Sequence, residues 1–497
     1  MNIMMLLEMA ASGFGERPAF VDPAEGSALT YQELFDSAAA TASAVKASGA
    51  GRLAMLDVNS VAFPVGLFAS GWAGIPFVPI NYRLTAEEID ALIGRIKPAY
   101  LVTEAHRVET FRDDESLETL ARHEFLDIAR SGGAGPDPWS MDPDDTAVML
   151  FTSGTTGAPK AAVLRQKHLV SYILNTVEFM SADESETALV SVPPYHVAGI
   201  AAVLSSVYSG RRVVQLANFS AEEWINLARK EGVTSAFVVP TMLARIVDAL
   251  EGASTAEMPH LQSLSYGGGR IPLPVIERAM ELFPDTDFTD AYGLTETSST
   301  ITVLGPEEHR AAFAASDEHA RRRMVSAGVA VPGIEIEIRD EAGKPLGRGE
   351  HGEVYVRGEQ VSGEYEGIGS TMDAEGWFPT HDAGYLDEAG YLFLEGRADD
   401  IIVRGGENIS PGEIEDVLME HEAVADAAVV GVPDTQWGES VAAAVVLRHD
   451  ASVEALQAWV KEHMRSSRVP ERIEFWSELP YTETGKLLRR IVREQMA

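Results

Sequence analysis

The chain has 497 residues, of which 45% are hydrophobic and 23% charged, and it carries a formal net charge of −37. This length exceeds what one hydrophobic core usually organises, so two or more domains are expected. The acidic balance argues against a nucleic-acid surface, which needs basic side chains to displace counterions, and against adhesion to anionic membranes. Because the chain has no cysteine, disulfides, thiolate metal sites and a cysteine nucleophile are excluded.

The N-terminal segment predicts neither a leader nor a membrane anchor. The stretch MNIMMLLEMA is apolar, but it has no basic residues ahead of its apolar part, and Glu8 interrupts it. No window reaches the roughly 18 unbroken apolar residues of a membrane span. We therefore expect a cytoplasmic protein without an integral membrane segment.

The first part of the chain predicts an α/β arrangement. Thr30 with Glu33 and Thr85 with Glu88 both match the capping box that begins a helix. The short apolar runs 53–57 and 100–102 are typical of strands. By itself, an arginine such as Arg83 beside one of these helices indicates a surface charge.

An unusual polar stretch interrupts an apolar run that ends at Phe151. It contains Thr152, Ser153, Gly154, Thr155, Thr156, Gly157 and Lys160. Glycines let the backbone approach a ligand, hydroxyls and N–H groups donate hydrogen bonds, and a lysine adds positive charge, so a phosphate-binding loop is one hypothesis. The pattern differs from the NTPase P-loop, because Lys160 follows a proline and leads into a strand-like run. A solvated Ser/Thr/Gly hairpin is the alternative.

The middle of the chain alternates strand-like and helical segments, which favours layered α/β sheets. The strand-like runs are 188–192, 213–216, 236–239 and 264–266. His196 directly follows the first of them, and a lone histidine is more often structural than functional. The segment YGGGR, residues 266–270, predicts at least a tight turn.

The segment AYGLTETSS, residues 291–299, combines four capabilities within one turn. Tyr292 offers a stacking face, Gly293 permits close backbone approach, Thr295 donates a hydroxyl and Glu296 can hold a hard cation. These four properties suit a nucleotide with its metal ion, and an exposed polar turn is the alternative.

The last hundred residues indicate a separate small α/β module. A strand is expected at 401–404, a helix from Pro411 capped by Ser410 and Glu413, and strands at 424–432 and 441–447.

Taken together, these segments resemble the AMP-forming acyl-CoA and aryl-CoA synthetases, a superfamily that includes luciferases and adenylation domains. The resemblance runs from about Ala28 to the C-terminus. It implies an α/β fold with a large N-terminal domain of layered sheets (1–396), a hinge (397–400) and a small mobile α+β lid (401–497). Asp399 matches the hinge position of this family.

The resemblance also implies a nucleotide site. The 152–160 loop would bind the ATP phosphates, the turn formed by Gly267, Gly268 and Gly269 would lie against adenine, and Tyr292 would stack on it beside Gly293. Thr295 would bind the α-phosphate, Glu296 would hold Mg2+, and Asp382 with Arg397 would bind the ribose. At the nucleotide site the chain departs from the family twice. Gly269-Arg270 replaces Ala-Pro, and His381 replaces a glycine, which puts an imidazole beside the nucleotide.

The acid and the thiol would bind on either side of this nucleotide. His196 would orient the carboxylate or swing aside for the thiol, and Val197, Ala198, Gly199 and Gly267 would line an acyl pocket. These small, uncharged residues favour an apolar acid. In related CoA ligases an arginine near Arg83 can contact the CoA phosphates, and the pair Gly405-Gly406 borders the pantetheine tunnel. Trp437 offers a face on which the CoA adenine could stack. The glycine pair and Trp437 could equally be ordinary turn residues. Lys486 in YTETGKLLRR matches the catalytic lysine that reaches from the lid into the cleft.

The predicted enzyme is an ATP-dependent carboxylic acid–CoA ligase that forms acyl-AMP and pyrophosphate and then acyl-CoA and AMP. It would use ATP, Mg2+ and CoA, with a medium- or long-chain fatty, aryl or alicyclic acid as substrate. One alternative is an adenylating enzyme that passes the acyl group to a carrier protein. Another is a non-catalytic nucleotide-binding or scaffold protein. A homodimer is possible, and no nucleic-acid partner is expected.

Overall fold

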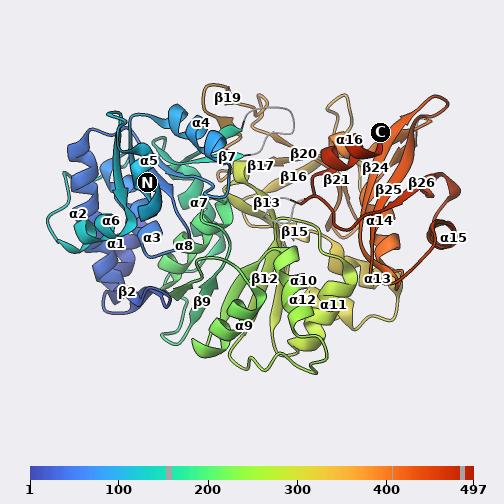
Figure 1. The fold of residues 1–497 in the computed structure, drawn as a ribbon, viewed down its shortest axis with the longest axis horizontal. Helices are drawn as coiled ribbons and strands as arrows, with labels where there is room; N and C mark the ends of the chain where they lie inside the picture. The colour runs from blue at the N-terminus through green and yellow to red at the C-terminus, as the bar shows by residue number, and fades with distance from the viewer. Residues whose placement is uncertain (153–158, 406, 482–486) are drawn as a thin grey trace.

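Three sheets build the large N-terminal part of the molecule, and a fourth sheet builds the C-terminal part (Figure 1). The computed structural model describes residues 1–152, 159–405, 407–481 and 487–497. The predicted α/β fold, with a large N-terminal domain and a smaller C-terminal domain, is confirmed. The position of the boundary between them, at 397–400, stays a prediction.

The first sheet is mostly parallel, with its two ends formed by antiparallel pairs. Its order is β15 (Val329–Ala330), β14 (Ser299–Leu304), β13 (Asp287–Leu294), β12 (Ser263–Gly267), β11 (Ser235–Val238), β9 (Thr187–Val190), β10 (Arg212–Gln215), β1 (Pro18–Asp22) and β2 (Ser27–Thr30). The strands predicted from 188, 213, 236 and 264 are therefore present. Their short apolar runs are typical of parallel strands covered on both faces.

The second sheet carries the polar stretch after Phe151. Its order is β19 (Gly369–Ser370), β18 (Glu364–Tyr365), β8 (Lys160–Arg165), β7 (Thr146–Thr152), β4 (Phe77–Pro79), β3 (Leu53–Leu56), β5 (Ala99–Thr103) and β6 (Leu117–Ala121). A smaller antiparallel sheet has the order β16 (Glu335–Arg339), β17 (Gly352–Arg357), β20 (Phe378–Leu386) and β21 (Leu392–Arg397).

Helices cover these sheets and fill the space between the first two. They are α1 (Met4–Phe14), α2 (Tyr31–Ser48), α3 (Ala62–Ala73), α4 (Ala86–Ile96), α5 (Val108–Phe111), α6 (Arg122–Arg130), α7 (Gln166–Thr176), α8 (Val197–Ser209), α9 (Ala221–Lys230), α10 (Pro240–Ala249), α11 (Leu273–Leu282), α12 (Pro306–Phe313) and α13 (Glu318–Arg321). One buried core joins α1, α2, α3 and α8 to strands of both sheets. The capping boxes predicted at Thr30 and Thr85 begin α2 and α4.

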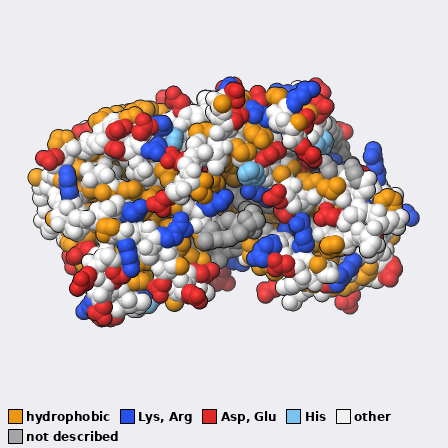
Figure 2. Space-filling view, turned by 90° about the horizontal axis from the view of Figure 1, so that it is seen from above, with side chains coloured by type: hydrophobic (Ala, Val, Ile, Leu, Met, Phe, Trp, Pro, Cys, Tyr) orange, Lys and Arg blue, Asp and Glu red, His pale blue; other side chains and the backbone are white. Residues whose placement is uncertain are grey.

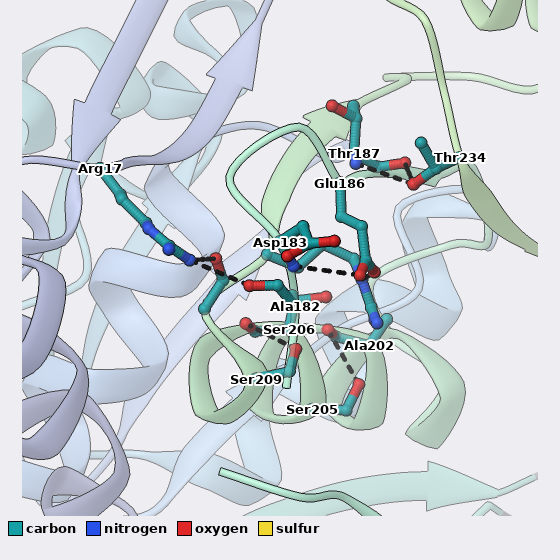
Figure 3. A network of polar contacts seen from close by, with 12 residues as sticks. Arg17, Ala182, Asp183, Glu186, Thr187, Ala202, Ser205, Ser206, Ser209 and Thr234 are labelled. Atoms are coloured by element: carbon teal, nitrogen blue, oxygen red, sulfur yellow. Dashed lines mark hydrogen bonds and ion pairs between the residues drawn. The ribbon is translucent and has the colours of Figure 1, made fainter. Parts of the chain in front are cut away.

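Polar contacts fix the C-terminal end of α8, whose other end carries the predicted acid-binding residues (Figure 3). The guanidinium of Arg17 donates to the carbonyl oxygens of Ala182 and Gly210 at 3.1 and 3.4 Å. Nearby, Thr234 bonds the backbone of Thr187 and so joins the segment after α9 to β9. These contacts hold the C-terminal end of α8, and its N-terminal end lies just beyond the carboxyl end of β9.

The C-terminal domain is one sheet with helices on both faces. Its strands are β23 (Glu407–Ile409), β22 (Ile402–Arg404), β25 (Gly438–Leu447) and β24 (Val424–Asp434), with β26 (Arg472–Phe475) beside β25. Alternate residues of β24 and β25 point to opposite faces. One face packs against α14 (Pro411–Met419) and α15 (Val453–His463), and the other packs against α16 (Arg489–Met496).

The predicted cap of α14 is wrong in its detail. The helix begins at Pro411, as expected, but the Ser410 side chain makes no capping hydrogen bond. Its hydroxyl donates instead to the carbonyl oxygen of Glu395 at 3.0 Å, and Glu413 pairs with Arg468. A contact with β21 of the large domain has thus replaced the local cap.

Within the described part of the chain, no helix combines the length and the apolar character needed to cross a membrane.

Candidate active site

The polar stretch after Phe151 connects two paired antiparallel strands. Thr152 ends β7 opposite Lys160, which begins β8, and the Thr152 hydroxyl lies 3.4 Å from the Lys160 carbonyl oxygen. The structure therefore confirms that a strand, not a helix, follows the lysine. The predicted phosphate-binding residues between them, Ser153, Gly154, Thr155, Thr156 and Gly157, lie outside the described residues. The Lys160 ammonium lies 5.2 Å from the centre of the Tyr365 ring.

The turn that carries Thr295 and Glu296 is a short 3₁₀ helix, η2 (Thr295–Thr297), between β13 and β14. Gly293 is essential to its shape, because a Cβ atom there would lie 1.8 Å from the carbonyl oxygen of Ser299. The loop 360–363 supports the turn from behind, since the amides of Ser362 and Gly363 both donate to the Glu296 carbonyl oxygen. The Glu296 side chain is thus placed by a rigid backbone.

Tyr365 joins the two predicted phosphate-binding regions. Its hydroxyl donates to the Glu296 carboxylate at 2.6 Å, while its ring lies under the Lys160 ammonium. Burial and the charge of Glu296 raise the pKa of Tyr365, so the phenol keeps its proton and acts as a donor. The sequence analysis did not identify Tyr365, because GEYEG has no distinctive pattern and β18 meets β8 only in the folded chain.

The chemistry of Glu296 suits magnesium, which prefers oxygen ligands and keeps several water molecules. Among the residues that the structure describes, no group of three or more His, Asp or Glu side chains could hold a metal ion. A single carboxylate can suffice for such an ion, because Mg2+ is usually bound through one or two carboxylates together with substrate phosphates and water.

Asp382, Tyr292 and Arg397 form a connected polar group at the other end of this region. The Tyr292 hydroxyl donates to one Asp382 oxygen at 2.6 Å, and Arg397 donates to the other at 3.0 Å. Arg397 also donates to the carbonyl oxygen of Thr380 at 3.0 Å, so its position is fixed. The structure thus brings together the residues predicted for adenine and ribose, which are 90 positions apart in the chain.

A bulge in β20 aims Asp382 inward. Glu353 and Tyr355 of β17 pair with Ala383 and Pro379, which leaves 380–382 bulged out of the ladder. His381 takes up the bend with a φ of +58°, and its ring N–H donates to the Glu353 carboxylate, with 2.9 Å between Nδ1 and Oε1. The imidazole is 63% exposed and contacts Glu353. The replacement of the usual glycine by His381 therefore leaves the contacts of Asp382 intact.

His196 stands immediately before α8, at the end of the loop that follows β9. Its ring packs against Tyr195 at a centroid distance of 4.7 Å. Burial lowers the pKa of His196 to about 4, so the imidazole is neutral near pH 7. Val197 and Ala198 are partly buried and Gly199 is buried in the first turn of the helix, so the predicted acyl-pocket residues share one short segment.

The glycine turn after β12 has a structural cause. A Cβ atom on Gly267 would lie 2.1 Å from the Ala291 carbonyl oxygen of the neighbouring β13, and Gly268 has a φ of +85°. Strand packing therefore accounts for a glycine at position 267, and the predicted place of Gly267 in the acyl pocket stays a prediction. Gly269 continues the turn on the exposed surface.

Asp290 is a second residue that sequence reasoning missed. It lies on β13 beside Tyr266, two residues before Tyr292. Its side chain opens partly onto the surface, yet protein surrounds it so closely that burial raises its pKa to about 8. A carboxyl group that is protonated near pH 7 can both donate and accept a hydrogen bond. Its signal in the sequence is a single aspartate directly before the AYGLTETSS segment, within what folds as β13.

The residues predicted to bind CoA are only partly brought together. The ring of Trp437 covers Gly405, and the Gly405 amide donates to the Trp437 carbonyl oxygen at 2.8 Å. Gly405 also has a φ of +59°, which explains the glycine by the turn itself. Arg83 lies in the other domain near Tyr82 and Asn218. Gly406 and Lys486 lie outside the described residues.

The predicted hinge residue, Asp399, is exposed in η4 (Ala398–Asp400), the short turn between β21 and β22. Seen from above, Lys and Arg side chains lie on both sides of the region where the two halves of the molecule meet (Figure 2). Such side chains suit an anionic ligand, although the whole chain is acidic.

Comparison with known proteins assigns this architecture. The AMP-binding enzyme family matches residues 7–366, and the AMP-binding enzyme C-terminal domain matches residues 413–486. Fatty acid–[acyl-carrier-protein] ligase ScoC of Streptomyces coeruleorubidus is 33% identical, over 95% of this chain and 92% of its own. Feruloyl-CoA synthase of an Amycolatopsis species is 32% identical, over 95% and 94%.

A solved structure agrees with this assignment. The o-succinylbenzoate CoA synthetase MenE of Bacillus subtilis, in complex with its acyl-adenylate intermediate, superposes with a TM-score of 0.84 at 28% identity, covering 98% of this chain and 97% of that chain. The motifs, the fold and the matched domains agree along almost the whole sequence, and the chain belongs to the AMP-binding enzyme family.

Proposed function

We propose that the protein is an ATP-dependent carboxylic acid–CoA ligase. It joins an acid to AMP with release of pyrophosphate and then transfers the acyl group to the thiol of CoA. One observation carries the proposal: the Asp382–Tyr292–Arg397 group and the Glu296–Tyr365–Lys160 group lie on one framework, built from strands that are distant in the chain. The first group suits a ribose, and the second suits a phosphate with its metal ion.

In the first step, the acid carboxylate attacks the α-phosphate of ATP and pyrophosphate leaves. Two anions must meet, so the protein has to position them and neutralise charge as it develops. Asp382 and Arg397 would hold the ribose, Thr295 would donate to the α-phosphate, and Lys160 and Lys486 would supply positive charge. A magnesium ion bound through Glu296 would supply further charge neutralisation.

The second step is attack of the CoA thiol on the mixed anhydride of acyl-AMP, with AMP as leaving group. The neutral imidazole of His196, at the start of the acyl-binding segment, would orient the carboxylate in the first step and make way for the thiol in the second. Arg83, Gly405, Gly406 and Trp437 remain the proposed CoA contacts, with Asp399 as the pivot that brings the lid residues to the site.

The acid is proposed to be apolar, with aryl, fatty or alicyclic acids preferred. Val197, Ala198 and Gly199 add no charge to the segment that would line the acyl group, and they are small enough to admit a ring or chain. Feruloyl-CoA synthase carries an aryl acid in its name, and ScoC carries a fatty acid.

A carrier protein is the second candidate acceptor, and the similarity to ScoC favours it specifically. A comparison of acceptors separates the two. The purified chain would be given ATP, Mg2+ and a panel of acids, and pyrophosphate release would be measured with CoA, with an acylatable carrier protein and with neither. Acid-dependent release stimulated by CoA supports the proposal. Stimulation by the carrier alone supports the alternative, and absence of acid-dependent ATP–pyrophosphate exchange would refute both.

Lys486 provides a sharper test of the chemistry. Lys486→Ala should reduce adenylation by about 10²-fold or more, the usual effect of losing one preorganised charge donor, while thioester formation from supplied acyl-AMP largely survives. Lys344→Ala, a change at an exposed lysine between β16 and β17, is a matched control and should affect neither step. Equal losses in both half-reactions of the Lys486 variant would overturn its role.

A further inference from the structure

The two domains are joined by an ion pair at a position where this chain departs from its family. Arg270 follows the Gly267–Gly269 turn of the large domain, where resemblance predicts a proline. Its guanidinium donates to the carboxylate of Asp416, which lies on α14 of the C-terminal domain. A proline at position 270 could not make this contact, so the pair is a feature of this chain.

The shape of α14 matches the arginine. Gly412 lies one helical turn before Asp416 and therefore on the same side of α14. A Cβ atom on Gly412 would lie 2.0 Å from Nη1 of Arg270 and 3.4 Å from the Glu395 carbonyl oxygen. The Arg270 side chain thus occupies the space that any other residue at position 412 would fill.

Electrostatics make the pair selective for this arrangement of the domains. Burial and, to a smaller extent, the charges of Glu415 and Glu420 raise the pKa of Asp416 to about 6, although Arg270 and Arg322 act in the opposite direction. Glu415 is itself paired with Arg489. Ionisation of the Asp416 carboxyl group in this position is costly unless a cation is beside it. The Arg270 guanidinium, in turn, lies near the first turn of a helix, where the helix dipole opposes a positive charge. Each partner therefore needs the other here.

The remaining contacts identify which face of the C-terminal domain meets the body. Ser410, directly before α14, donates to Glu395 of β21, and α14 packs on that strand. The described contacts of Gly405 and Trp437, by contrast, are with their own domain. The arrangement is therefore one in which α14, and not the proposed CoA-binding turn, faces the large domain.

We propose that Arg270 is a positioning residue: its pairing with Asp416, in the space left by Gly412, holds the C-terminal domain in the adenylating arrangement and sets the balance between the two half-reactions. This inference rests on the proposed two-step ligase. Loss of the pair should slow formation of acyl-AMP, while conversion of supplied acyl-AMP to the thioester keeps its rate or becomes faster.

Arg270→Met tests this because it keeps much of the aliphatic stem and removes the charge. ATP–pyrophosphate exchange should fall by about tenfold or more, equivalent to at least about 1.4 kcal/mol in barrier height, with thioester formation from acyl-AMP at least at the wild-type rate. The reciprocal double variant, Arg270→Asp with Asp416→Arg, should regain most of the exchange activity. Arg310→Met removes a comparable ion pair within the large domain, that with Asp287, and should leave the balance unchanged.

Gly412→Ala provides an independent variant, because its methyl group displaces the guanidinium without removing any charge. Gly412→Ala should lower ATP–pyrophosphate exchange as Arg270→Met does. The double variant should lose no more exchange activity than either single variant. Equal loss of both half-reactions in these variants, unchanged exchange in Arg270→Met, or failure of the charge reversal to restore exchange would each overturn the proposal.

A distance measurement separates this inference from the proposed function. The chain has no cysteine, so spin labels can be placed on Glu184→Cys in the large domain and Glu462→Cys in the C-terminal domain, both at exposed positions. In the double-cysteine protein that is otherwise wild type, the distance between the two spin labels should have a narrow distribution. When Arg270→Met is added, this distribution should become broad or shift. An unchanged distribution would refute the positioning role even in a protein that proved inactive as a ligase.

Discussion

Tyr365 contacts both Glu296, the predicted magnesium ligand, and Lys160, and the removal of its single hydroxyl oxygen tests this link. Tyr365→Phe removes the hydroxyl that donates to Glu296 and leaves the ring beneath Lys160. Hydrogen bonds to charged groups are worth about 1.5–3 kcal/mol, so kcat/KM for ATP should fall by about tenfold or more and half-saturation should need more Mg2+.

The control for this change is Tyr355→Phe, which removes a hydroxyl 3.5 Å from Glu353 in the neighbouring small sheet. That variant should keep the wild-type dependence on Mg2+. If Tyr365→Phe also keeps it, Tyr365 does not position Glu296 for the metal ion.

Asp290 predicts a pH dependence of stability. Its pKa in the folded protein, about 8, lies above its ordinary value of 3.8, so the folded state holds this proton more tightly than the unfolded state. The resulting stabilisation is complete below about pH 4 and is lost as the pH rises toward 8. Asp290→Asn should remove this loss. The urea midpoint of the variant minus that of the wild type should therefore increase as the pH is raised from about 5 to about 9.

Asp113→Asn, a change at an exposed aspartate, should show no such trend and serves as the control. A difference between Asp290→Asn and wild type that stays constant with pH would show that the Asp290 carboxyl group titrates normally.

The residues that sequence could identify differ physically from those it missed. Glu296, Asp382 and Arg397 stand in segments whose local chemistry already suits a nucleotide, and the structure brings Asp382 and Arg397 into contact. Tyr365 and Asp290 have ordinary local sequences. Their properties come from neighbours on other strands, Glu296 for the tyrosine and the enclosing protein for the aspartate, which no local pattern records.

Among the elements, β13 is held in place by two close glycine contacts. Gly293 lies against β14, and the Ala291 carbonyl oxygen lies against Gly267 of β12. Gly293→Ala should therefore displace the turn bearing Glu296, with a loss of stability of about 1–3 kcal/mol from overpacking and a fall in adenylation of tenfold or more.

Gly94→Ala is the matched control for that change. Gly94 lies in the last turn of α4 with open space around its Cβ position, so alanine should stabilise the protein, by up to about 0.5–1 kcal/mol. Urea unfolding and ATP–pyrophosphate exchange on both variants would test the argument. Wild-type adenylation by Gly293→Ala would show that the turn tolerates displacement.

The elements were predictable where their signals are local. The capping boxes of α2 and α4 and the apolar runs of β9 to β12 correctly identified helices and strands. The capping of α14 was not predictable, because the Ser410 hydroxyl bonds a carbonyl group in a distant strand. Short edge strands such as β18 and β19 exist only through pairing with neighbours and have no periodicity of their own.

At the scale of the molecule, the proposed hinge at Asp399 links the two half-reactions. Proline fixes φ near −65° and removes an N–H group, so Asp399→Pro should restrict rotation at η4. ATP–pyrophosphate exchange should persist while thioester formation from supplied acyl-AMP falls by an order of magnitude or more, about 1.4 kcal/mol per tenfold.

Both half-reactions should be measured on one preparation of Asp399→Pro, which controls for misfolding. A wild-type rate in the second half-reaction would show that Asp399 is not the pivot. The family and the general architecture were predictable from the order of the motifs. The Arg270–Asp416 contact was not, because it depends on how two separately folded domains meet.

The Arg270–Asp416 pair also makes the enzyme responsive to dissolved salt. Its side chains are 35% and 28% exposed, so mobile ions can reach the pair and screen it, over a Debye length that shrinks from about 10 Å at 0.1 M to about 3 Å at 1 M. Rising ionic strength should therefore slow acyl-AMP formation more than thioester formation in the wild type, and this difference should be smaller in Arg270→Met. The ion concentration around the enzyme would then regulate how long the activated acid stays bound before it reaches its acceptor.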